Sequence, residues 1–370
     1  MRGVPTARDL TRAKAPRTQR ARAARPRLGG TKDICPVTRN GRTPTLLTTC
    51  QQWAFMVLIA VEEGLPMSSV RPSHEEARRY VVGPDSLSWA QASDVRRLLL
   101  APYALLLQVA HPTVGAGVAE HSNFTNEPWQ RLTRTLDYVD LLVYGGDDAI
   151  QTASRVREMH KRIKGVRPDG GKYHALEPEA YAWVHATLML AIVELHSRYI
   201  RRLTPDDIES SYQEWLGLGR LLGIRDGDLP TDWAGFQSYC DTMIRDRLVD
   251  NETVQTVLRT IRTPAPPPGW PQRLGWLWRL VRLPAGYVLT LTGADALPPE
   301  LRQRFGVPWS ASKQRQADAL AAISRAITPI LPRRARVSGP TYLRLRRKAI
   351  ACDEFAPDSY LDHSSRPGGR

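Results

Sequence analysis

The sequence predicts an all-α protein with one large helical domain. From about Ser86 onward, apolar residues recur at intervals of three and four, which is the spacing of one face of a helix. Alternating runs of β-branched residues, which are typical of strands, are few, and Pro and Gly separate the periodic segments. With 370 residues, of which 42% are hydrophobic, the chain is long enough to bury a sizeable core.

The ends of the expected helices follow from local chemistry. Pro112 ends the first helix, because proline cannot donate a hydrogen bond to the preceding turn. Gly145 and Gly146 separate the second helix from the third, and a proline cluster from Pro264 to Pro271 breaks the chain before a Trp-rich segment. We expect helices over residues 88–110, 128–144, 147–164, 177–202, 205–222, 232–249, 252–261, 274–291, 310–328 and 340–350.

A basic N-terminal tail precedes the helical domain. Residues 1–66 contain 12 Lys or Arg against four acidic residues, and so carry +8 of the formal charge of +15. The lack of apolar periodicity up to about Pro44 predicts disorder. The apolar run 53–61 mimics a secretory signal, but Glu62 and Glu63 follow it, and Met67 is a natural initiator. We expect the domain over residues 67–335 and a C-terminal helix and tail over 336–370.

Composition and missing motifs exclude several classes of protein. The four cysteines form no CxxC pair, which indicates a reducing compartment, and we expect a cytoplasmic protein. No apolar run reaches the roughly 18 residues of a membrane-spanning helix. The basic tail lacks aromatic interleaving and zinc-ligand spacing, so no nucleic-acid partner is expected. Walker A and dinucleotide glycine patterns are also missing.

Two histidines lie on apolar helix faces. His185 belongs to a helix that is apolar nearly all round, so we expect its side chain to be buried. His160 projects from the apolar stripe of the third expected helix, which consists of Ala149, Ala153, Val156, His160 and Ile163. Each imidazole is either a hydrogen-bonded core group or a ligand. Spacing favours the core interpretation for His160 and does not separate the two roles for His185.

Basic residues flank the apolar stripe of the second expected helix. Arg131 and Arg134 lie three residues apart, and Thr135 follows them. Two guanidinium groups at this spacing repel each other. They therefore indicate either a solvated face or a shared anion, such as a carboxylate or a propionate.

Several short segments, in a fixed order, resemble one family of proteins. The first three are residues 108–118 (QVAHPTVGAGV), 121–124 (HSNF) and 128–135 (PWQRLTRT). The others are residues 156–160 (VREMH), 173–178 (YHALEP), 183–187 (WVHAT) and 297–306 (LPPELRQRFG). Together they resemble the catalytic domain shared by latex-clearing rubber oxygenases and the mycophenolic-acid-pathway oxygenase. The resemblance extends over about residues 86–332.

The resemblance implies an all-helical domain with a globin-like core that holds haem b. It implies that His160 is the proximal iron ligand, and that Arg131, Arg134 and Thr135 correspond to a distal Arg-x-x-Lys-Thr motif. Arg134 stands where that motif has lysine. Lysine can lose its proton and coordinate iron, whereas arginine stays charged. The lysine-capped resting state of the family is therefore not expected here.

The resemblance also implies an oxygenase that uses dioxygen on a small apolar substrate, which we take to be terpenoid, polyene or lipid-like. We place its pocket between the helices that bear Arg131, His160 and His185. Glu120 and Glu127 are candidate bases, although either is as consistent with a surface or capping role. Two other functions stay open: a haem-free protein of the same fold that binds a hydrophobic ligand, and an interaction protein that uses its basic tail.

Three further residues or segments have open roles. His111 either caps the last carbonyls of the first expected helix or touches a cofactor, and His121 lies in an expected loop. The Trp-rich segment combines Trp276 and Trp278 with Arg279 and Arg282. It is either a packed amphipathic helix or a peripheral membrane contact. The oligomeric state cannot be read from these patterns.

Overall fold

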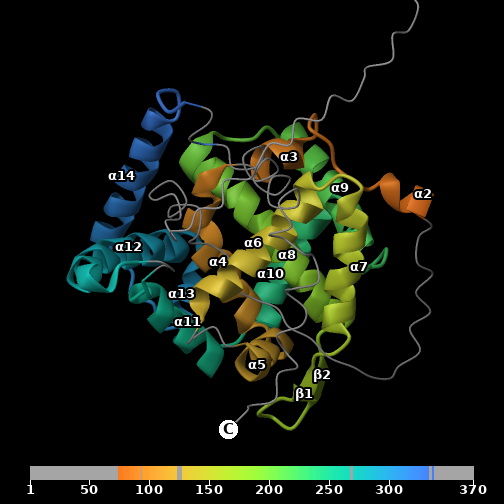
Figure 1. Ribbon diagram of the computed structural model, residues 1–370, viewed down its shortest axis with the longest axis horizontal. Helices are drawn as coiled ribbons and strands as arrows, with labels where there is room; N and C mark the ends of the chain where they lie inside the picture. Colours follow the sequence, from red (N-terminus) through yellow and green to blue (C-terminus); the bar gives the residue numbers. More distant parts are fainter. Residues whose placement is uncertain (1–73, 93, 123–126, 267–269, 333–335, 337–370) are drawn as a thin grey trace, which may run out of the picture. The chain divides into compact units, whose positions relative to one another are not determined.

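Helix α8 (Pro178–Leu195) is buried along most of its length and lies near the middle of the helical body in Figure 1. Its sequence is apolar nearly all round, so it can be stable only when other helices cover it on every side. Helix α4 (Ala101–Ala110), the preceding 3-10 helix η1 (Val95–Leu100) and α9 (Pro205–Leu222) pack directly against it. Trp183 of α8 is fully buried, and its indole Nε1 donates to the Leu107 carbonyl at 2.8 Å.

The structure is a computed structural model that describes residues 74–92, 94–122, 127–266, 270–332 and 336. These residues all belong to one compact unit, residues 42–370. The predicted basic tail (1–66) and the predicted helix 340–350 lie outside the described residues. Within them, the predicted all-α class is confirmed.

The first expected helix, 88–110, consists of three elements: α3 (Leu87–Ala92), η1 and α4. Asp94 explains part of the break, because its side chain accepts the Arg96 backbone N–H at 2.9 Å and so caps a new helix. Pro102 then occupies the first turn of α4, where its missing N–H does no harm.

Helix α5 (Pro112–His121) follows α4 directly, where we expected a loop. Pro112 ends α4 and also stands at the first turn of α5, so the chain bends at His111 and continues as helix. Among the helices in the described ranges, none is on its own long and apolar enough to cross a membrane. The bent pair Val95–Ala110 and Pro112–His121 reaches that length together, with a 102° bend. Leu100, Leu107 and Val109 of this pair are fully buried in the protein core.

Helices α6 (Pro128–Tyr144) and α7 (Asp148–His160) form a helical hairpin. The predicted separation at the two glycines is confirmed, and Gly146 adopts a left-handed φ of 58°. A short antiparallel β-hairpin, β1 (Lys164–Val166) and β2 (Lys172–His174), follows α7 and was not predicted. Tyr173 of this hairpin packs with Ile163 and Ala116, which places the hairpin against α5.

The remaining helices follow the predicted order. A π-helical turn, η2 (His196–Ile200), continues α8, and α9 begins with a reciprocal cap between Thr204 and Asp207. Helix α13 (Pro299–Arg304) was not predicted and lies between the expected helices 274–291 and 310–328. The other described elements are α2 (His74–Arg78), α10 (Trp233–Asp246), α11 (Glu252–Arg262), η3 (Gln272–Leu274), α12 (Gly275–Ala296) and α14 (Ala311–Ile327).

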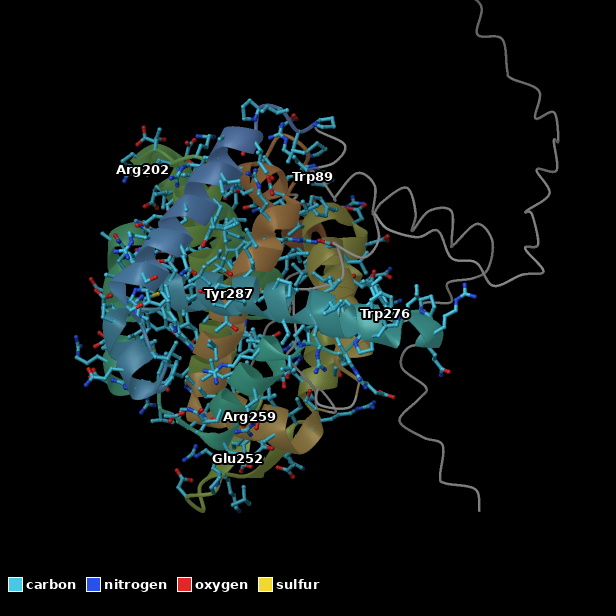
Figure 2. All side chains as sticks on the ribbon, turned by 90° about the vertical axis from the view of Figure 1, so that its left-hand side faces the viewer. Trp89, Arg202, Glu252, Arg259, Trp276 and Tyr287 are labelled. Carbon is cyan, nitrogen blue, oxygen red and sulfur yellow. The ribbon has the colours of Figure 1, made fainter. Side chains whose placement is uncertain are left out.

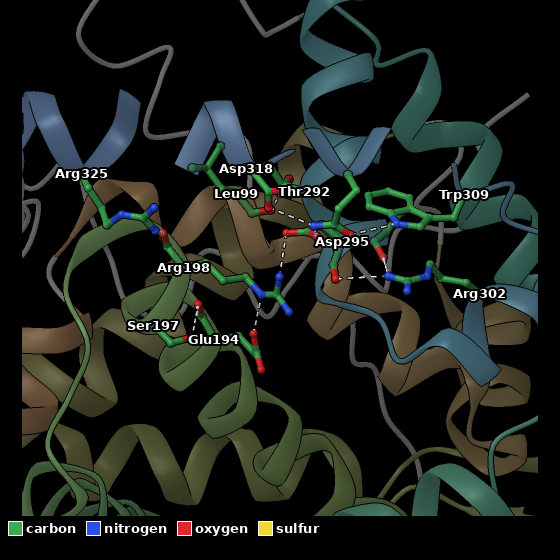
Figure 3. Close-up of polar contacts among 12 residues, drawn as sticks. Leu99, Glu194, Ser197, Arg198, Thr292, Asp295, Arg302, Trp309, Asp318 and Arg325 are labelled. Atoms are coloured by element: carbon green, nitrogen blue, oxygen red, sulfur yellow. Dashed lines mark hydrogen bonds and ion pairs between the residues drawn. The ribbon is translucent and has the colours of Figure 1, made fainter. Parts of the chain in front are cut away.

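Polar contacts around Asp295 fix the second half of α12 in the core (Figure 3). Its carboxylate accepts from Arg198 of η2 at 2.7 Å and from Gln314 of α14 at 3.3 Å. Thr292, one turn earlier, donates to the Leu99 carbonyl of η1 at 2.6 Å. Helix α12 is therefore tied to three neighbouring elements through its C-terminal half.

A buried ion pair joins η1 to α6. Both guanidinium nitrogens of Arg97 donate to the Asp140 carboxylate, at 2.6 and 2.9 Å, and the two side chains are only 12% and 7% exposed. In a bidentate pair of this kind, the attraction between the two charges offsets the free-energy cost of removing both from water. If one partner is lost, the other charge stays buried without a counter-charge.

Removal of one partner should expose that dependence. We expect Asp140→Ala to lower the free energy of unfolding by about 3–5 kcal/mol, because it leaves Arg97 charged and buried. The matched control is Arg78→Ala, which breaks the Arg78–Asp147 pair, whose side chains are 58% and 62% exposed. The control should change stability by less than about 1 kcal/mol. Urea denaturation of both variants measures the difference, and equal effects would contradict the prediction.

Candidate functional site

His160 is the last residue of α7, and its imidazole is buried. The ring nitrogen Nδ1 hydrogen-bonds to the Val156 carbonyl one turn earlier in the same helix. A carbonyl oxygen can only accept, so Nδ1 carries the hydrogen. In the neutral ring, Nε2 then carries the lone pair. A histidine that binds a metal needs this arrangement, with one nitrogen donating to a carbonyl and the other available as ligand.

Tyr181 of α8 borders the His160 ring. The two ring centroids are 5.5 Å apart with an interplanar angle of 70°, an edge-to-face contact. The Tyr181 hydroxyl donates to the Leu222 carbonyl at the end of α9 at 3.1 Å, which fixes its ring. Burial raises the pKa of Tyr181 well above its usual range, so this hydroxyl stays protonated. His160 is thus held between its own helix and a rigid aromatic side chain.

The α6–α7 hairpin brings the two predicted halves of the site to one end. The chain reverses between Tyr144 and Asp148, so the start of α6 and the end of α7 lie at the same end of the hairpin. The Tyr138 hydroxyl of α6 donates to the Met159 sulfur at 3.5 Å. Tyr138 is one turn after Thr135, and Met159 precedes His160. Thr135 is partly buried at this level.

The backbones of Arg131 and Arg134 lie in the first turns of α6, but their side chains are outside the described part of the structure. Their position in the hairpin puts them at the end that carries His160. The roles that the resemblance implies for these two arginines stay predictions.

His185 is engaged in a different way from His160. Its Nε2 donates to the Trp215 carbonyl of α9 at 2.8 Å, and the Trp215 indole Nε1 donates back to the His185 carbonyl at 3.0 Å. The two rings also stack, with centroids 4.9 Å apart. Nε2 therefore carries the hydrogen in His185, the opposite tautomer to His160. This geometry favours the packing role that spacing left open.

Gly219 explains how α9 approaches His185 so closely. A Cβ atom at this position would lie 3.1 Å from Nε2 of His185, which is closer than an ordinary contact. Any side chain at this position would require the imidazole ring or the helix to shift by a few tenths of an ångström.

A small apolar cavity of about 30 Å³ lies beside this part of α8. Val139 of α6 and Trp215 of α9 contribute to its wall, and Arg97 stands at its polar edge. The remaining lining residues are Ala92, Leu188, Ala191, Ile192 and Leu195. Val139 lies one turn after Thr135, and Leu188 lies one turn after His185. The cavity therefore borders α6 and α8, which carry Arg131 and His185, but none of its lining residues comes from α7, which carries His160.

Sequence reasoning missed the Arg97–Asp140 pair at this cavity. Asp140 follows Leu136 by four residues and precedes Val143 by three, so it falls on the apolar stripe of α6. A carboxylate on a buried stripe needs a partner, and that was the available signal. The identity of Arg97 as that partner, 43 residues away in sequence, had no local signature.

The other candidates lie in separate contacts. His111, at the α4–α5 bend, has Nε2 3.1 Å from Glu179 of α8, and burial lowers its pKa. His121 ends α5, and its Nε2 donates to the Lys164 carbonyl. The Glu120 side chain is 51% exposed and accepts from the Tyr173 hydroxyl at 2.6 Å. Glu127 is exposed at the start of α6 and makes no capping hydrogen bond with its side chain.

No group of three or more His, Cys, Asp or Glu side chains that could hold a metal ion is present among the described residues. A haem iron is bound differently, because the porphyrin supplies four nitrogens and the protein only an axial ligand. His160, with its tautomer fixed by Val156, fits that role as a donor.

Comparison with known proteins identifies the domain. The sequence profile of the family described as ER-bound oxygenase mpaB/B′/rubber oxygenase, catalytic domain, matches residues 89–326, well over half of the chain. The chain belongs to this family. The mpaB/rubber-oxygenase domain extends from α3 to α14, and membership confirms the resemblance inferred from the short segments. It supports an oxygenase, and hence an enzyme of the oxidoreductase class with a small-molecule substrate and oxygen.

Two bacterial relatives of this mpaB/rubber-oxygenase domain are similar over most of their length. They are the uncharacterized proteins Mb2261 of Mycobacterium bovis and Rv2237 of Mycobacterium tuberculosis. Each is 26% identical to this chain over 243 residues, which cover 64% of this chain and 91% of the relative. No solved structure matches the chain.

The buried state of His185 leads to a pH dependence of stability. Burial lowers its pKa to about 4, although the bond to the Trp215 carbonyl acts in the opposite direction. An unfolded histidine titrates near 6.5. Between about pH 6.5 and 4, the unfolded chain therefore binds a proton that the folded chain does not. Stability is lost as the pH falls through this window.

We expect His185 to contribute up to about 1.4 kcal/mol of this loss per pH unit. In His185→Gln, the amide can still donate to the Trp215 carbonyl but does not titrate. The slope of unfolding free energy against pH between 6 and 4.5 should fall by about that amount, as measured by urea denaturation at several pH values. If the variant had the same slope as the wild type, the pKa of His185 would be the same in the folded and the unfolded protein, which would contradict the prediction.

Proposed function

We propose that this protein is a haem b-dependent oxygenase that acts with dioxygen on an apolar substrate of terpenoid, polyene or lipid-like character. The observation that carries the proposal is the state of His160. It is a buried histidine whose Nδ1–H is donated to a carbonyl, so that Nε2 has the lone pair of an axial ligand. Membership in the oxygenase family supplies the reaction class.

His160 would hold the haem through Nε2, and the Val156 carbonyl would keep the ring in the required tautomer and orientation. When bound, haem b supplies the ferrous iron that activates dioxygen. Tyr181 makes an edge-to-face contact with the imidazole ring. Because its hydroxyl is committed to the Leu222 carbonyl, Tyr181 acts by packing and not as a proton donor.

The start of α6 would provide the polar groups on the same end of the hairpin. Arg131 and Arg134 are permanent cations suited to a propionate, and Thr135 can donate a hydrogen bond to an oxygen atom. We assign no catalytic base, because Glu120 accepts from the Tyr173 hydroxyl and Glu127 is exposed at the start of α6.

The apolar substrate class rests on the lining of the cavity between α6, α8 and α9. Its wall consists almost entirely of aliphatic and aromatic side chains, which exclude water and offer few hydrogen bonds to a polar molecule. The one charged group at its edge, Arg97, is already paired with Asp140.

Replacement of the axial ligand tests the proposal. Protein expressed with iron and a haem precursor should show a Soret band that survives gel filtration, and His160→Ala should reduce bound haem by about tenfold or more. His185→Gln is the matched control and should keep the band, because that imidazole is bound to Trp215. A colourless, folded wild-type protein would refute haem binding and leave the two haem-free alternatives, a hydrophobic-ligand binding protein and an interaction protein.

Arg134 supplies a second, spectroscopic prediction. The family motif has lysine at this position, and a deprotonated lysine can coordinate iron whereas arginine cannot. We expect Arg134→Lys to change the visible spectrum of the ligand-free, haem-loaded protein. The control is Lys161→Arg, at the surface just beyond α7. Identical spectra for wild type and Arg134→Lys would remove residue 134 from the haem environment.

A further inference from the structure

The first half of α12 exposes an apolar stripe to solvent. Trp276, Leu280, Leu283 and Tyr287 are between 46% and 62% exposed. They stand at positions i, i+4, i+7 and i+11, so they share one face of the helix. Figure 2 shows α12 crossing this side of the protein, with Trp276 and Tyr287 along it. Large side chains of this kind, gathered in one place, mark a binding surface.

Helix α14 extends the same surface. Ile323 and Ile327 are 58% and 42% exposed and lie four residues apart. Gln316 belongs to the same face of α14, seven residues before Ile323, and it accepts a hydrogen bond from the Tyr287 hydroxyl. The two exposed stripes are therefore neighbours. We call the six residues Trp276, Leu280, Leu283, Tyr287, Ile323 and Ile327 the α12–α14 face.

The charged residues of α12 before Asp295 are all arginines. Between Glu252 and Asp295 the chain contains five arginines and no acidic residue. Arg273 and Arg279 are exposed, and Arg279 lies one turn after Trp276. An apolar stripe bordered by arginines and containing Trp and Tyr is the composition of a helix that lies in the interface of an anionic bilayer.

A second copy of the chain and the N-terminal tail are both poor occupants for this face. A second copy in a two-fold dimer would bring the arginines of α12 against the same arginines of its partner. The N-terminal 66 residues carry a net charge of +8, so they would be repelled as well. Anionic phospholipid headgroups, in contrast, would pair with the arginines while the acyl region receives the apolar side chains.

Contacts in the second half of α12 fix the position of the whole helix in the protein without a membrane. Asp295 is bound to Arg198 and Gln314, and Thr292 to the Leu99 carbonyl. The exposed half continues from this fixed segment as one helix. Binding therefore needs no folding of the helix, and the entropy cost of ordering it is already met.

We propose that the α12–α14 face binds the surface of an anionic phospholipid bilayer, with α12 parallel to the membrane plane. This inference stands apart from the proposed oxygenase activity, because none of the six residues belongs to the site around His160.

Vesicle flotation with the full-length chain tests the proposal. The vesicles contain phosphatidylcholine and phosphatidylglycerol in a 7:3 ratio, with pure phosphatidylcholine for comparison. We expect binding to the anionic vesicles only, and a partition coefficient about tenfold lower for Leu280→Asp combined with Leu283→Asp. The control is Val166→Asp, an equally exposed apolar residue on β1, which should bind like the wild type.

All variants keep the basic tail, so its contribution is the same in each. Equal binding by wild type and the double variant would assign binding to another part of the chain and overturn the proposal, as would failure of the wild type to bind. A dimer of the wild type in sedimentation that the double variant abolishes, without vesicle binding, would identify a second copy as the occupant. If the aspartates unfold the chain, Leu280→Gln with Leu283→Gln serves the same comparison.

A quenching experiment locates the contact. Lipids brominated on their acyl chains should quench part of the tryptophan fluorescence of the wild type, and Trp276→Phe should remove most of that quenching while it retains binding. Quenching that is unchanged in Trp276→Phe would place a different tryptophan at the membrane and overturn the proposed orientation.

Discussion

Helix α8 has almost no side that faces solvent, so each polar group on it must find a hydrogen-bond partner inside the protein. This constraint fixes its neighbours. Trp183 donates to the Leu107 carbonyl of α4, Thr187 accepts from Gln108 of α4, and His185 exchanges hydrogen bonds with Trp215 of α9. An amphipathic helix could slide or rotate against its neighbours at modest cost. Helix α8 cannot, because a shift of α4 or α9 would leave buried donors unpaired, at a cost of about 1–3 kcal/mol each.

The same constraint separates the two buried histidines by chemistry. The hydrogen of His185 is on Nε2, because α9 presents the Trp215 carbonyl to that atom. The hydrogen of His160 is on Nδ1, because the Val156 carbonyl of its own helix accepts it. Two imidazoles that look alike in sequence therefore differ in which nitrogen offers a lone pair. Because the chain reverses between α6 and α7, the first turns of α6 lie at the same end of the hairpin as His160. The candidate site is thus positioned by helix α8, which is packed on all sides, and by the α6–α7 hairpin.

Much of the fold could be predicted because its signals are local. The bounds of α6 and α9 agree with the predicted ranges, since Pro128 and Pro205 in the first turns and the glycines after Tyr144 and Leu222 act within a few residues. Helix α5 was missed because Pro112 both ends α4 and stands in the first turn of α5. The sequence pattern indicates only the end of the first of these helices. The β-hairpin was missed because strands of three residues have no measurable alternation. The Arg97–Asp140 pair and the partner of His185 could not be predicted, because each depends on residues at least 30 positions apart whose meeting is decided by packing.

Gly219 links the distance between two helices to the position of a proton. Because a hydrogen atom is all that separates the α9 backbone from the His185 ring there, α8 and α9 approach closely enough for the Trp215 carbonyl to reach Nε2. A methyl group at residue 219 would require the ring or the helix to move by a few tenths of an ångström, and so would act on the hydrogen bond that decides the tautomer of the ring. The size of the side chain on one helix therefore acts on which nitrogen of an imidazole in the neighbouring helix carries the hydrogen.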